Sequence, residues 1–227
     1  MKIRGVLVLI LTFFSNFLQG AVCRTDLLKL VSGGEPLEKI LWIDIETGGR
    51  GQGQPILEIA AAAVDGNLQI VDRYHTLVFQ LPEVLDAMEP EARAMHEANG
   101  LLEELKQGAK YKNQIEKELL AFLEKNFGAA PTIFIGGNSV NFDLGFLRRD
   151  FFSLSKKLNY RVLDVSSFRL AAQLVYGVKA EKPYGHRAAQ DVELSVRELA
   201  TYFDLFAKGP VFKQNEDPLN WDPDGFL

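Results

Sequence analysis

The stretch LWIDIETGG, residues 41–49, decides the fold. Its apolar residues are typical of a buried β-strand, yet Asp44 and Glu46 interrupt the run at a spacing of two. Because side chains alternate between the two faces of a strand, both carboxylates point the same way. Burying two unpaired carboxylates costs several kcal/mol each, so this face needs solvent or a cation. Taken alone, the pair could also be two acids fraying into water at a strand end.

Length and composition bound the architecture. The 227 residues, of which 47% are hydrophobic, suit one globular domain. The net charge of −5 provides no overall basic field, which argues against a protein that binds long duplex nucleic acid. Cys23 is the single cysteine, so an intramolecular disulfide and a cysteine zinc site are excluded.

The first 23 residues look like a targeting segment. Lys2 and Arg4 precede an uncharged stretch, residues 5–23, that begins apolar and ends in small residues. This pattern is typical of a secretory signal peptide, so we expect an exported or periplasmic protein. Two alternatives stay open, an uncleaved membrane anchor and a start codon placed too far upstream.

The rest of the chain predicts an α/β domain with a mixed five-stranded sheet flanked by helices. Strand-like runs follow the opening strand at residues 56–64, 68–79, 132–137 and 160–167. We assign residues 24–39 to a lead-in segment, residues 40–208 to the domain and residues 209–227 to a surface tail.

Apolar residues recur at helical spacing through most of residues 82–127. The same spacing appears after the fourth and after the fifth strand, so we expect helices there as well. We expect a helix to start at Pro90, a cap at Asn138 or Ser139, and a serine cap after the fifth strand. The last helix should begin near His186.

Three later residues complement the opening pair. Asp143 follows the strand TIFIGG at the carboxyl edge of the sheet, where α/β folds keep their sites. His186 follows a loop, and Asp191 lies in the first turns of the last helix. Singly, Asp143 could serve the helix dipole and His186 could be a surface residue.

Together these five residues resemble the DEDDh class of 3′–5′ exonucleases, which has an RNase H-like fold. The order is Asp44, Glu46, Asp143, His186 and Asp191. Four segments narrow the resemblance to oligoribonuclease, which degrades very short RNA: MHEANGLLEEL (95–105), GGNSVNFDLGFL (136–147), YRVLDVSSF (160–168) and HRAAQDVELSVREL (186–199).

The resemblance implies a role for each of the five. Asp44 would bridge two divalent cations, Mg²⁺ or Mn²⁺. Glu46 and Asp191 would complete one metal site, and Asp143 would support the second. His186 would be the general base. The physics agrees, because hard cations take oxygen ligands and an imidazole can accept a proton from water near neutral pH.

The resemblance also implies how substrate and subunits are arranged. Residues corresponding to a cap on the terminal 5′ phosphate are Ser139, Tyr160, Arg161 and Ser166. His96 corresponds to the base pocket, and Thr47 is a further substrate-binding candidate. The family is homodimeric, with Tyr160 serving the neighbouring subunit's site, and it is ordinarily cytoplasmic.

One departure concerns the opening motif. Oligoribonucleases usually read D-x-E-M-T-G-L, with an apolar wedge for the bases, whereas this chain reads DIETGGR at residues 44–50. Glycine or arginine therefore stands where leucine belongs, and dinucleotide selectivity could be weaker. The extra glycines also predict a more mobile loop.

Two alternative functions stay open at this point. One is a broader DEDDh exonuclease that acts on single-stranded DNA or longer RNA ends, which the DIETG start fits somewhat better. The other is a nucleic-acid-binding module that has kept the fold without turnover.

Overall fold

The computed structural model describes residues 37–130, 132–178 and 185–209. All of its elements belong to one unit that begins at Lys39. The leader expected in residues 1–23, nearly all of the lead-in and the tail beyond residue 209 lie outside the described residues. Within the described ranges, no helix is long and apolar enough to cross a membrane.

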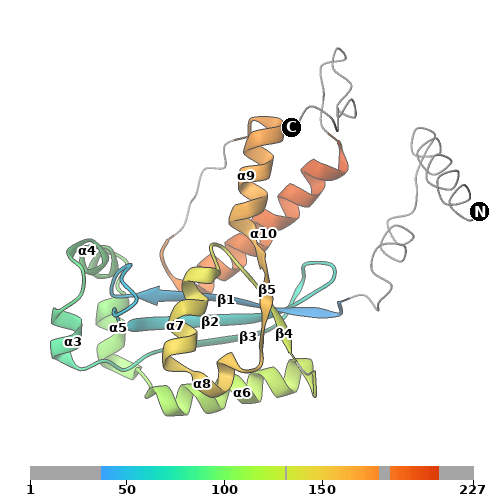
Figure 1. Ribbon diagram of the computed structural model, residues 1–227. Coiled ribbons are helices and arrows are strands. Elements are labelled where there is room, and N and C mark those ends of the chain that lie inside the picture. The colour runs from blue at the N-terminus through green and yellow to red at the C-terminus, as the bar shows by residue number, and fades with distance from the viewer. Residues whose placement is uncertain (1–36, 131, 179–184, 210–227) are drawn as a thin grey trace, which may run out of the picture. The chain divides into compact units, whose positions relative to one another are not determined.

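Five strands form one mixed sheet in the order β3-β2-β1-β4-β5 (Figure 1). They are β1 (Lys39–Thr47), β2 (Ile56–Asp65), β3 (Ile70–Leu77), β4 (Ile133–Gly137) and β5 (Leu158–Asp164). The first three pair antiparallel, while β4 pairs parallel with β1 and with β5. The predicted α/β fold with a mixed five-stranded sheet is confirmed, although β3 is shorter than expected and β5 begins and ends earlier.

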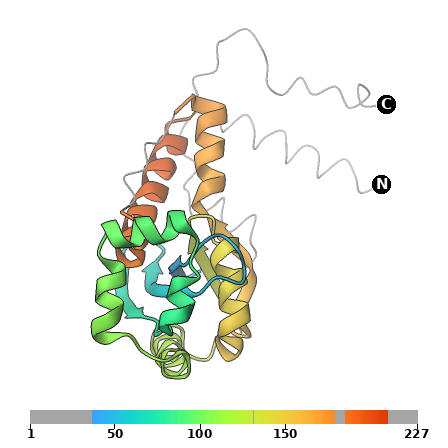
Figure 2. The same cartoon turned by 90° about the vertical axis from the view of Figure 1, so that its left-hand side faces the viewer.

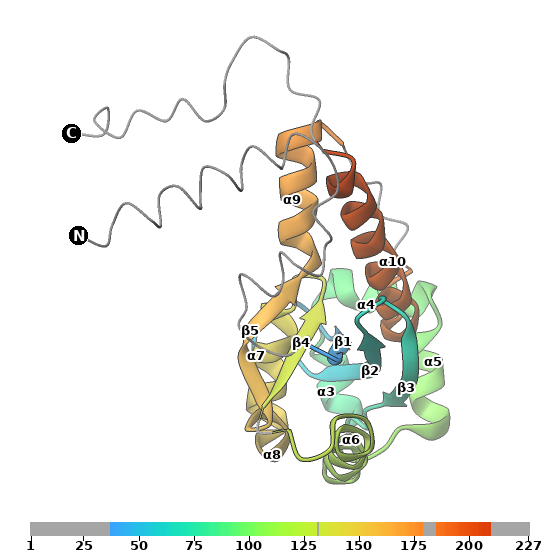
Figure 3. The same cartoon turned by 90° about the vertical axis from the view of Figure 1, so that its right-hand side faces the viewer.

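Helices cover both faces of the sheet and one of its ends. On one face lie α6 (Lys112–Phe127), α7 (Asn141–Asp150) and α8 (Phe152–Ser155), and on the other lies α10 (Ala188–Ala207), packed against α9 (Val165–Tyr176) (Figure 3). Near the end of β1 lie α3 (Pro82–Asp86), α4 (Pro90–Ala98) and α5 (Leu101–Gly108) (Figure 2).

Alternation along β1 separates two cores. Ile43 and Ile45 pack with residues of α6, α7 and α8, whereas Ile40 and Trp42 pack with residues of α10. Because the side-chain period of a strand is two, Asp44 and Glu46 continue the row of Ile40 and Trp42. The two acids therefore face the side of the sheet that α10 covers.

A buried hydrogen bond sets where α10 crosses β1. Trp42 Nε1 donates to Ser195 Oγ at 2.7 Å. Gly136 of β4 makes room for the indole, since a Cβ at that position would come within 2.6 Å of the Trp42 ring. Asp191 lies about one helical turn before Ser195, and Asp44 follows Trp42 on the same face of β1. The bond thus brings the start of α10 over the acids of β1.

Two of the predicted helix caps are wrong. Neither Asn138 nor Ser139 caps α7; Ser139 has φ 58°, and its backbone N–H donates to the Asp164 carboxylate at 2.9 Å. The cap of α9 is Asp164 rather than a serine, because its carboxylate accepts from Ser166 N. One carboxylate at the end of β5 therefore serves two neighbouring segments. Pro90 does begin α4, as predicted.

Ser195→Ala tests the bond between β1 and α10. The variant leaves the buried Trp42 N–H without its partner, which costs about 1–3 kcal/mol of unfolding free energy. Urea denaturation measures this loss. Thr201→Ala is the matched control, because that hydroxyl also bonds a helix carbonyl of α10 but is exposed. Equal losses in the two variants would contradict the role given to Ser195.

Candidate active site

A cleft of about 410 Å³ opens where β1 ends. Its wall includes Asp44, Glu46, Thr47, His186 and Asp191. The rest of the wall comes from β1, the loop after it, α4 and the region of α7: Ile45, Gly49, Arg50, Glu89, Glu91, Ala92, Met95, Asn138 and Phe142. The cleft therefore brings together five of the residues that the sequence predicts for the site, from distant parts of the chain, while Asp143 is not part of its wall.

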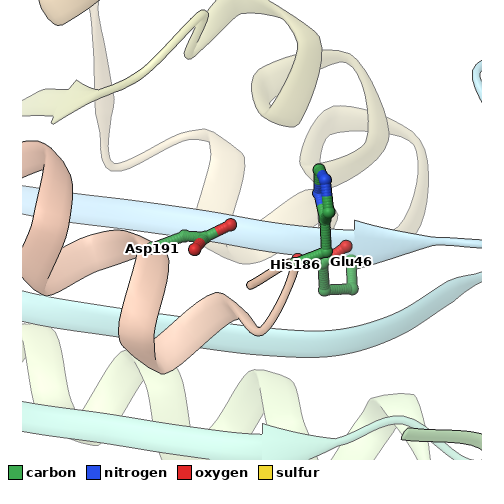
Figure 4. A group of neighbouring side chains, drawn as sticks. All are labelled: Glu46, His186 and Asp191. Atoms are coloured by element: carbon green, nitrogen blue, oxygen red, sulfur yellow. The ribbon is translucent and has the colours of Figure 1, made fainter. Parts of the chain in front are cut away.

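Three side chains form a cluster in this cleft. Glu46, His186 and Asp191 each offer one ligand atom, and these atoms lie within 4.8 Å of one another (Figure 4). Glu46 and Asp191 are buried, whereas His186 is exposed. Two carboxylates and an imidazole at this spacing fit a divalent cation.

Asp143 lies on α7, close enough to Asp44 for their charges to interact. It is buried, and its Oδ1 accepts a hydrogen bond from Ile45 N at 3.0 Å. Strand β4 pairs with β1 only at Leu41 and Trp42, so Ile45 N–H lies beyond that pairing. Asp143 takes the place of a strand partner there. This bond holds its carboxylate beside the part of β1 that carries Asp44 and Glu46.

The crowding of the carboxylates appears in their pKa values. Burial, reinforced by repulsion from Asp143 and Glu46, raises the pKa of Asp44 well above its usual range. Burial and then the charge of Asp191 raise the pKa of Glu46 to about 8, and burial raises the pKa of Asp143 to about 8. A nearby dication would reverse this tendency by favouring the charged forms.

A fifth carboxylate, Glu58, is neutralised by protein groups. It lies opposite Glu46 on β2 and is 1% exposed. Its oxygens contact His75 Nε2 at 2.6 Å, Arg187 Nη2 at 3.1 Å and Ala188 N at 2.9 Å. Burial opposes ionisation of Glu58, but these hydrogen bonds outweigh it and hold the pKa below its usual value. Glu58 therefore anchors the start of α10, and protein groups neutralise its charge without a cation.

The backbone of His186 adopts an uncommon conformation. Its φ is 52°, in the left-handed region, where a residue with a Cβ costs on the order of 1 kcal/mol. Asn99 Nδ2 donates to the His186 carbonyl oxygen at 2.6 Å. Asn99 belongs to the turn between α4 and α5, so the turn and the histidine backbone are joined directly.

His96 lies behind the cleft wall. It is wholly buried, and because a carbonyl oxygen only accepts, His96 Nε2–H donates to Thr47 O at 3.0 Å. The same nitrogen lies 3.8 Å from Glu46 Oε2. Burial lowers the pKa of His96, which favours the neutral ring. The sequence places His96 in the base pocket, whereas in the structure its neighbour Met95 lines the cleft.

The glycine-rich loop after β1 is anchored at two points. The Glu89 carboxylate accepts from Arg50 N at 3.0 Å and from Gly51 N at 3.1 Å. Arg149 Nη1 donates to the Gln54 carbonyl oxygen at 2.9 Å. These two long-range contacts keep Arg50 at the cleft wall, and the greater mobility expected from the glycines stays a prediction.

The residues expected to form the phosphate cap fall into two groups. Ser139 N and the Ser166 hydroxyl both donate to Asp164 Oδ1, at 2.9 and 2.6 Å, so these serines are brought together. Tyr160 is 75% exposed on the edge strand β5. The Arg161 guanidinium carbon lies 5.3 Å from the Tyr160 ring centroid, and neither residue lines the cleft.

Sequence reasoning missed several residues of the site. Glu58 is a lone acid within the apolar run PILEIAAAAV, the same signal that marks Asp44, and could have been found that way. Arg187 adjoins His186 in sequence. Asn99 and Asn138 give no periodic signal, since only the fold brings them to the site.

Comparison with known proteins places the chain in a family. The exonuclease (RNase T) family matches residues 41–199. The chain is 32% identical to Oligoribonuclease of Corynebacterium glutamicum (strain R) over 198 residues, which cover 83% of this chain and 90% of that protein. It is 36% identical to Oligoribonuclease of Streptomyces coelicolor over 174 residues, which cover 73% and 85% of the two chains.

Solved structures share the fold at low sequence identity. E. coli Exonuclease I in complex with a 5cy-dT13 oligonucleotide has a TM-score of 0.53 at 16% identity, covering 75% of this chain and 43% of that one. The zinc ion bound form of the E. coli Exonuclease I–ssDNA complex has a TM-score of 0.54 at 14% identity, covering 75% of this chain and 43% of that one. This chain thus spans less than half the length of Exonuclease I.

The raised pKa values predict how stability depends on pH in a chelator. A carboxyl whose pKa is higher in the folded than in the unfolded state binds more protons when folded, so stability falls as pH rises from about 4 through 8. Asp44→Asn removes one such group. We predict that it raises the melting temperature, by ~2 °C or more at pH 9, and by less at pH 5.

Differential scanning calorimetry with chelator measures this increase. Asp204→Asn, an exposed change on α10, is the control and should shift the melting temperature little at either pH. A lower melting temperature of Asp44→Asn at pH 9 would show that Asp44 is not repelled in the apo protein.

Proposed function

Because the chain belongs to the exonuclease family, and within it to the oligoribonuclease group, it is a 3′–5′ exonuclease, and we propose that it degrades short oligoribonucleotides, down to dinucleotides, to nucleoside 5′-monophosphates. One observation carries the proposal. Glu46, His186 and Asp191 converge within 4.8 Å in a cleft whose wall also includes Asp44.

The acids of the site suit two divalent cations, Mg²⁺ or Mn²⁺. We assign Asp44, Glu46 and Asp191 to one cation, and Asp44 with Asp143 to the other. When bound, the cations supply the positive charge that phosphodiester hydrolysis needs at the attacking and leaving oxygens. The donor set fits, because carboxylate oxygens suit hard cations and the crowded acids otherwise repel one another.

His186 is the proton acceptor in this proposal. Its exposed position at the cleft gives a ring nitrogen access to the water that attacks the phosphodiester. His96 is a poorer candidate because it is wholly buried and its Nε2–H is used by Thr47 O. Asp143 and the other acids are reserved for the cations.

Short substrates fit both the charge and the cleft. A net charge of −5 gives the protein no overall basic field for a long polyanion, so cations and local groups hold the phosphates in this proposal. We place the terminal phosphate near Ser139 and Ser166, with Arg161 completing the cap. Phe142 and Met95 offer apolar surface to the bases, and Gly49 or Arg50, both in the cleft wall, stands where the family's wedge residue belongs.

We further propose a homodimer, supported by an exposed apolar stripe on α9. Leu170 and Leu174 recur at a spacing of four and are 66% and 87% exposed, and Val175 beside them is 47% exposed. A stripe of this kind is typical of an interaction surface. A second copy would cover it and would also bury Tyr160, which we expect to serve the neighbouring subunit's site.

The catalytic unit in this proposal is residues 40–208. The leader expected in residues 1–23 would determine whether the enzyme acts outside the cytoplasm, and it would contact a membrane only if it stays uncleaved. Residues 209–227 are assigned no role in hydrolysis.

A broader exonuclease acting on single-stranded DNA or longer RNA is the second candidate, favoured by the fold shared with E. coli Exonuclease I in its oligonucleotide complex. An idle binding module is a weaker candidate, because the acids and the histidine needed for turnover gather in one cleft.

A time course on three substrates separates these functions. We predict release of nucleoside monophosphates from a 5′-phosphorylated RNA dimer faster than from an RNA of ~7 nucleotides or a DNA oligomer, with chelator silencing every reaction. Preference for the longer RNA or DNA would instead support the broader exonuclease, and cation binding without any hydrolysis would support the idle module.

Asp191→Asn should abolish turnover while the protein stays folded, and His186→Ala should lower kcat roughly 10²-fold or more.

Leu174→Asp tests the proposed dimer. A carboxylate in the middle of the stripe on α9 should convert a dimer to a monomer, because burying an unpaired charge at an interface is costly. Sedimentation velocity measures the change. Val71→Asp is the control, since Val71 is 50% exposed on β3, away from α9. A wild-type protein that sediments as a monomer would contradict this part of the proposal.

A further inference from the structure

The backbone conformation of His186 is not explained by the proximity of its side chain to Glu46 and Asp191. Its φ of 52° is unusual for a residue with a side chain, and such conformations persist only where the surroundings enforce them. His186 is also exposed, so packing contributes little to fixing it. Hydrogen bonds to its backbone can supply the enforcing contacts.

One enforcing contact is the side-chain amide of Asn99. Its Nδ2 donates to the His186 carbonyl oxygen at 2.6 Å and approaches the Gly185 carbonyl oxygen at 3.5 Å. Its Oδ1 accepts from Leu101 N at 3.1 Å, at the start of α5. Both halves of the amide are used, so the orientation of the amide is set by α5 and the N–H is aimed at the histidine backbone.

The chain after His186 is held separately. Arg187 bonds the buried Glu58 at 3.1 Å and Glu104 of α5 at 2.7 Å, and Ala188 N donates to Glu58 at 2.9 Å. Glu58 thus fixes the beginning of α10. The peptide between His186 and Arg187 comes directly before this anchored segment, and Asn99 binds the oxygen of that peptide.

We propose that Asn99 is a positioning residue for His186. By holding the His186 carbonyl oxygen, it keeps the backbone in the left-handed conformation from which the imidazole reaches the cleft beside Glu46 and Asp191. The assignment rests on the proposed function in that His186 is the proton acceptor there. Asn99 itself does not line the cleft, so it acts through His186.

Two substitutions separate this role from helix capping. Asn99→Asp keeps an oxygen that accepts from Leu101 N but replaces the donor to His186 with a second acceptor. Asn99→Ala removes both contacts and adds no charge. We expect kcat on the RNA dimer to fall about 10- to 100-fold in both variants, because small displacements of a reacting group cost that much. KM and Mn²⁺ affinity should stay within about twofold of wild type.

Asn126→Asp is the matched control. Asn126 Nδ2 also donates to a backbone carbonyl, that of Phe122 at 2.9 Å, but it lies on α6 on the other face of the sheet. Its kcat should equal that of wild type. An Asn99→Asp enzyme with wild-type kcat would overturn the proposal, and combined with a slow Asn99→Ala it would assign Asn99 to capping α5 alone.

A double variant tests whether Asn99 acts through the histidine. If it does, adding Asn99→Asp to His186→Ala should lower kcat no further, since the group to be positioned is already gone. Additive losses would mean a general structural effect and would contradict the proposal. This comparison distinguishes positioning from simple destabilisation, which lowers the rate in either background.

A readout independent of activity uses the three histidines of the chain. Their imidazole NMR signals are few, and His186 is assigned by the signal that His186→Ala removes. Asn99→Asp should move or broaden the His186 signal and leave that of His75 in place, whereas an unchanged His186 signal would refute the contact. If wild type hydrolyses no oligonucleotide, the proposed function fails, while this spectrum still decides the contact.

Discussion

Repulsion among closely placed carboxylates is the constraint on which this structure depends. Asp44 and Glu46 come from a central strand, Asp143 from α7 and Asp191 from α10. Burial and repulsion by neighbouring acids raise the pKa of Asp44 and Glu46, and burial raises that of Asp143. The fold brings them together nonetheless, because apolar packing on both faces of the sheet fixes the elements that carry them. Energy stored in this way is recovered when dications bind, which is why such a cluster points to a metal-dependent hydrolase rather than to a structural role.

Glu58 is a buried acid of the same sheet whose charge is neutralised by protein groups. Its carboxylate lies opposite Glu46 and is equally buried, yet it is surrounded by His75, Arg187 and a backbone N–H of α10. Its pKa is therefore lowered, whereas that of Glu46 is raised. The two neighbouring glutamates therefore differ in role, since Glu58 fixes the start of α10, whereas burial and the charge of Asp191 oppose ionisation of Glu46, which is assigned to a cation in the proposed function.

The sequence predicts the parts of this site that rest on local pattern. The spacing of Asp44 and Glu46 on one strand and the place of Asp143 after β4 follow from periodicity and from the order of elements. The helix caps were wrong at Ser139 because Asp164, distant in sequence, takes its N–H. The hydrogen bond from Asn99 to the His186 carbonyl oxygen could not be predicted from the sequence either, because periodicity carries no information about which distant segments meet.

Crystals soaked in Mn²⁺ test the central claim most directly, because anomalous diffraction locates the metal without reference to activity. The account predicts anomalous peaks in the cleft at the end of β1, one among Asp44, Glu46 and Asp191 and one beside Asp143. Peaks only at surface acids elsewhere, with none in this cleft at saturating Mn²⁺, would contradict it.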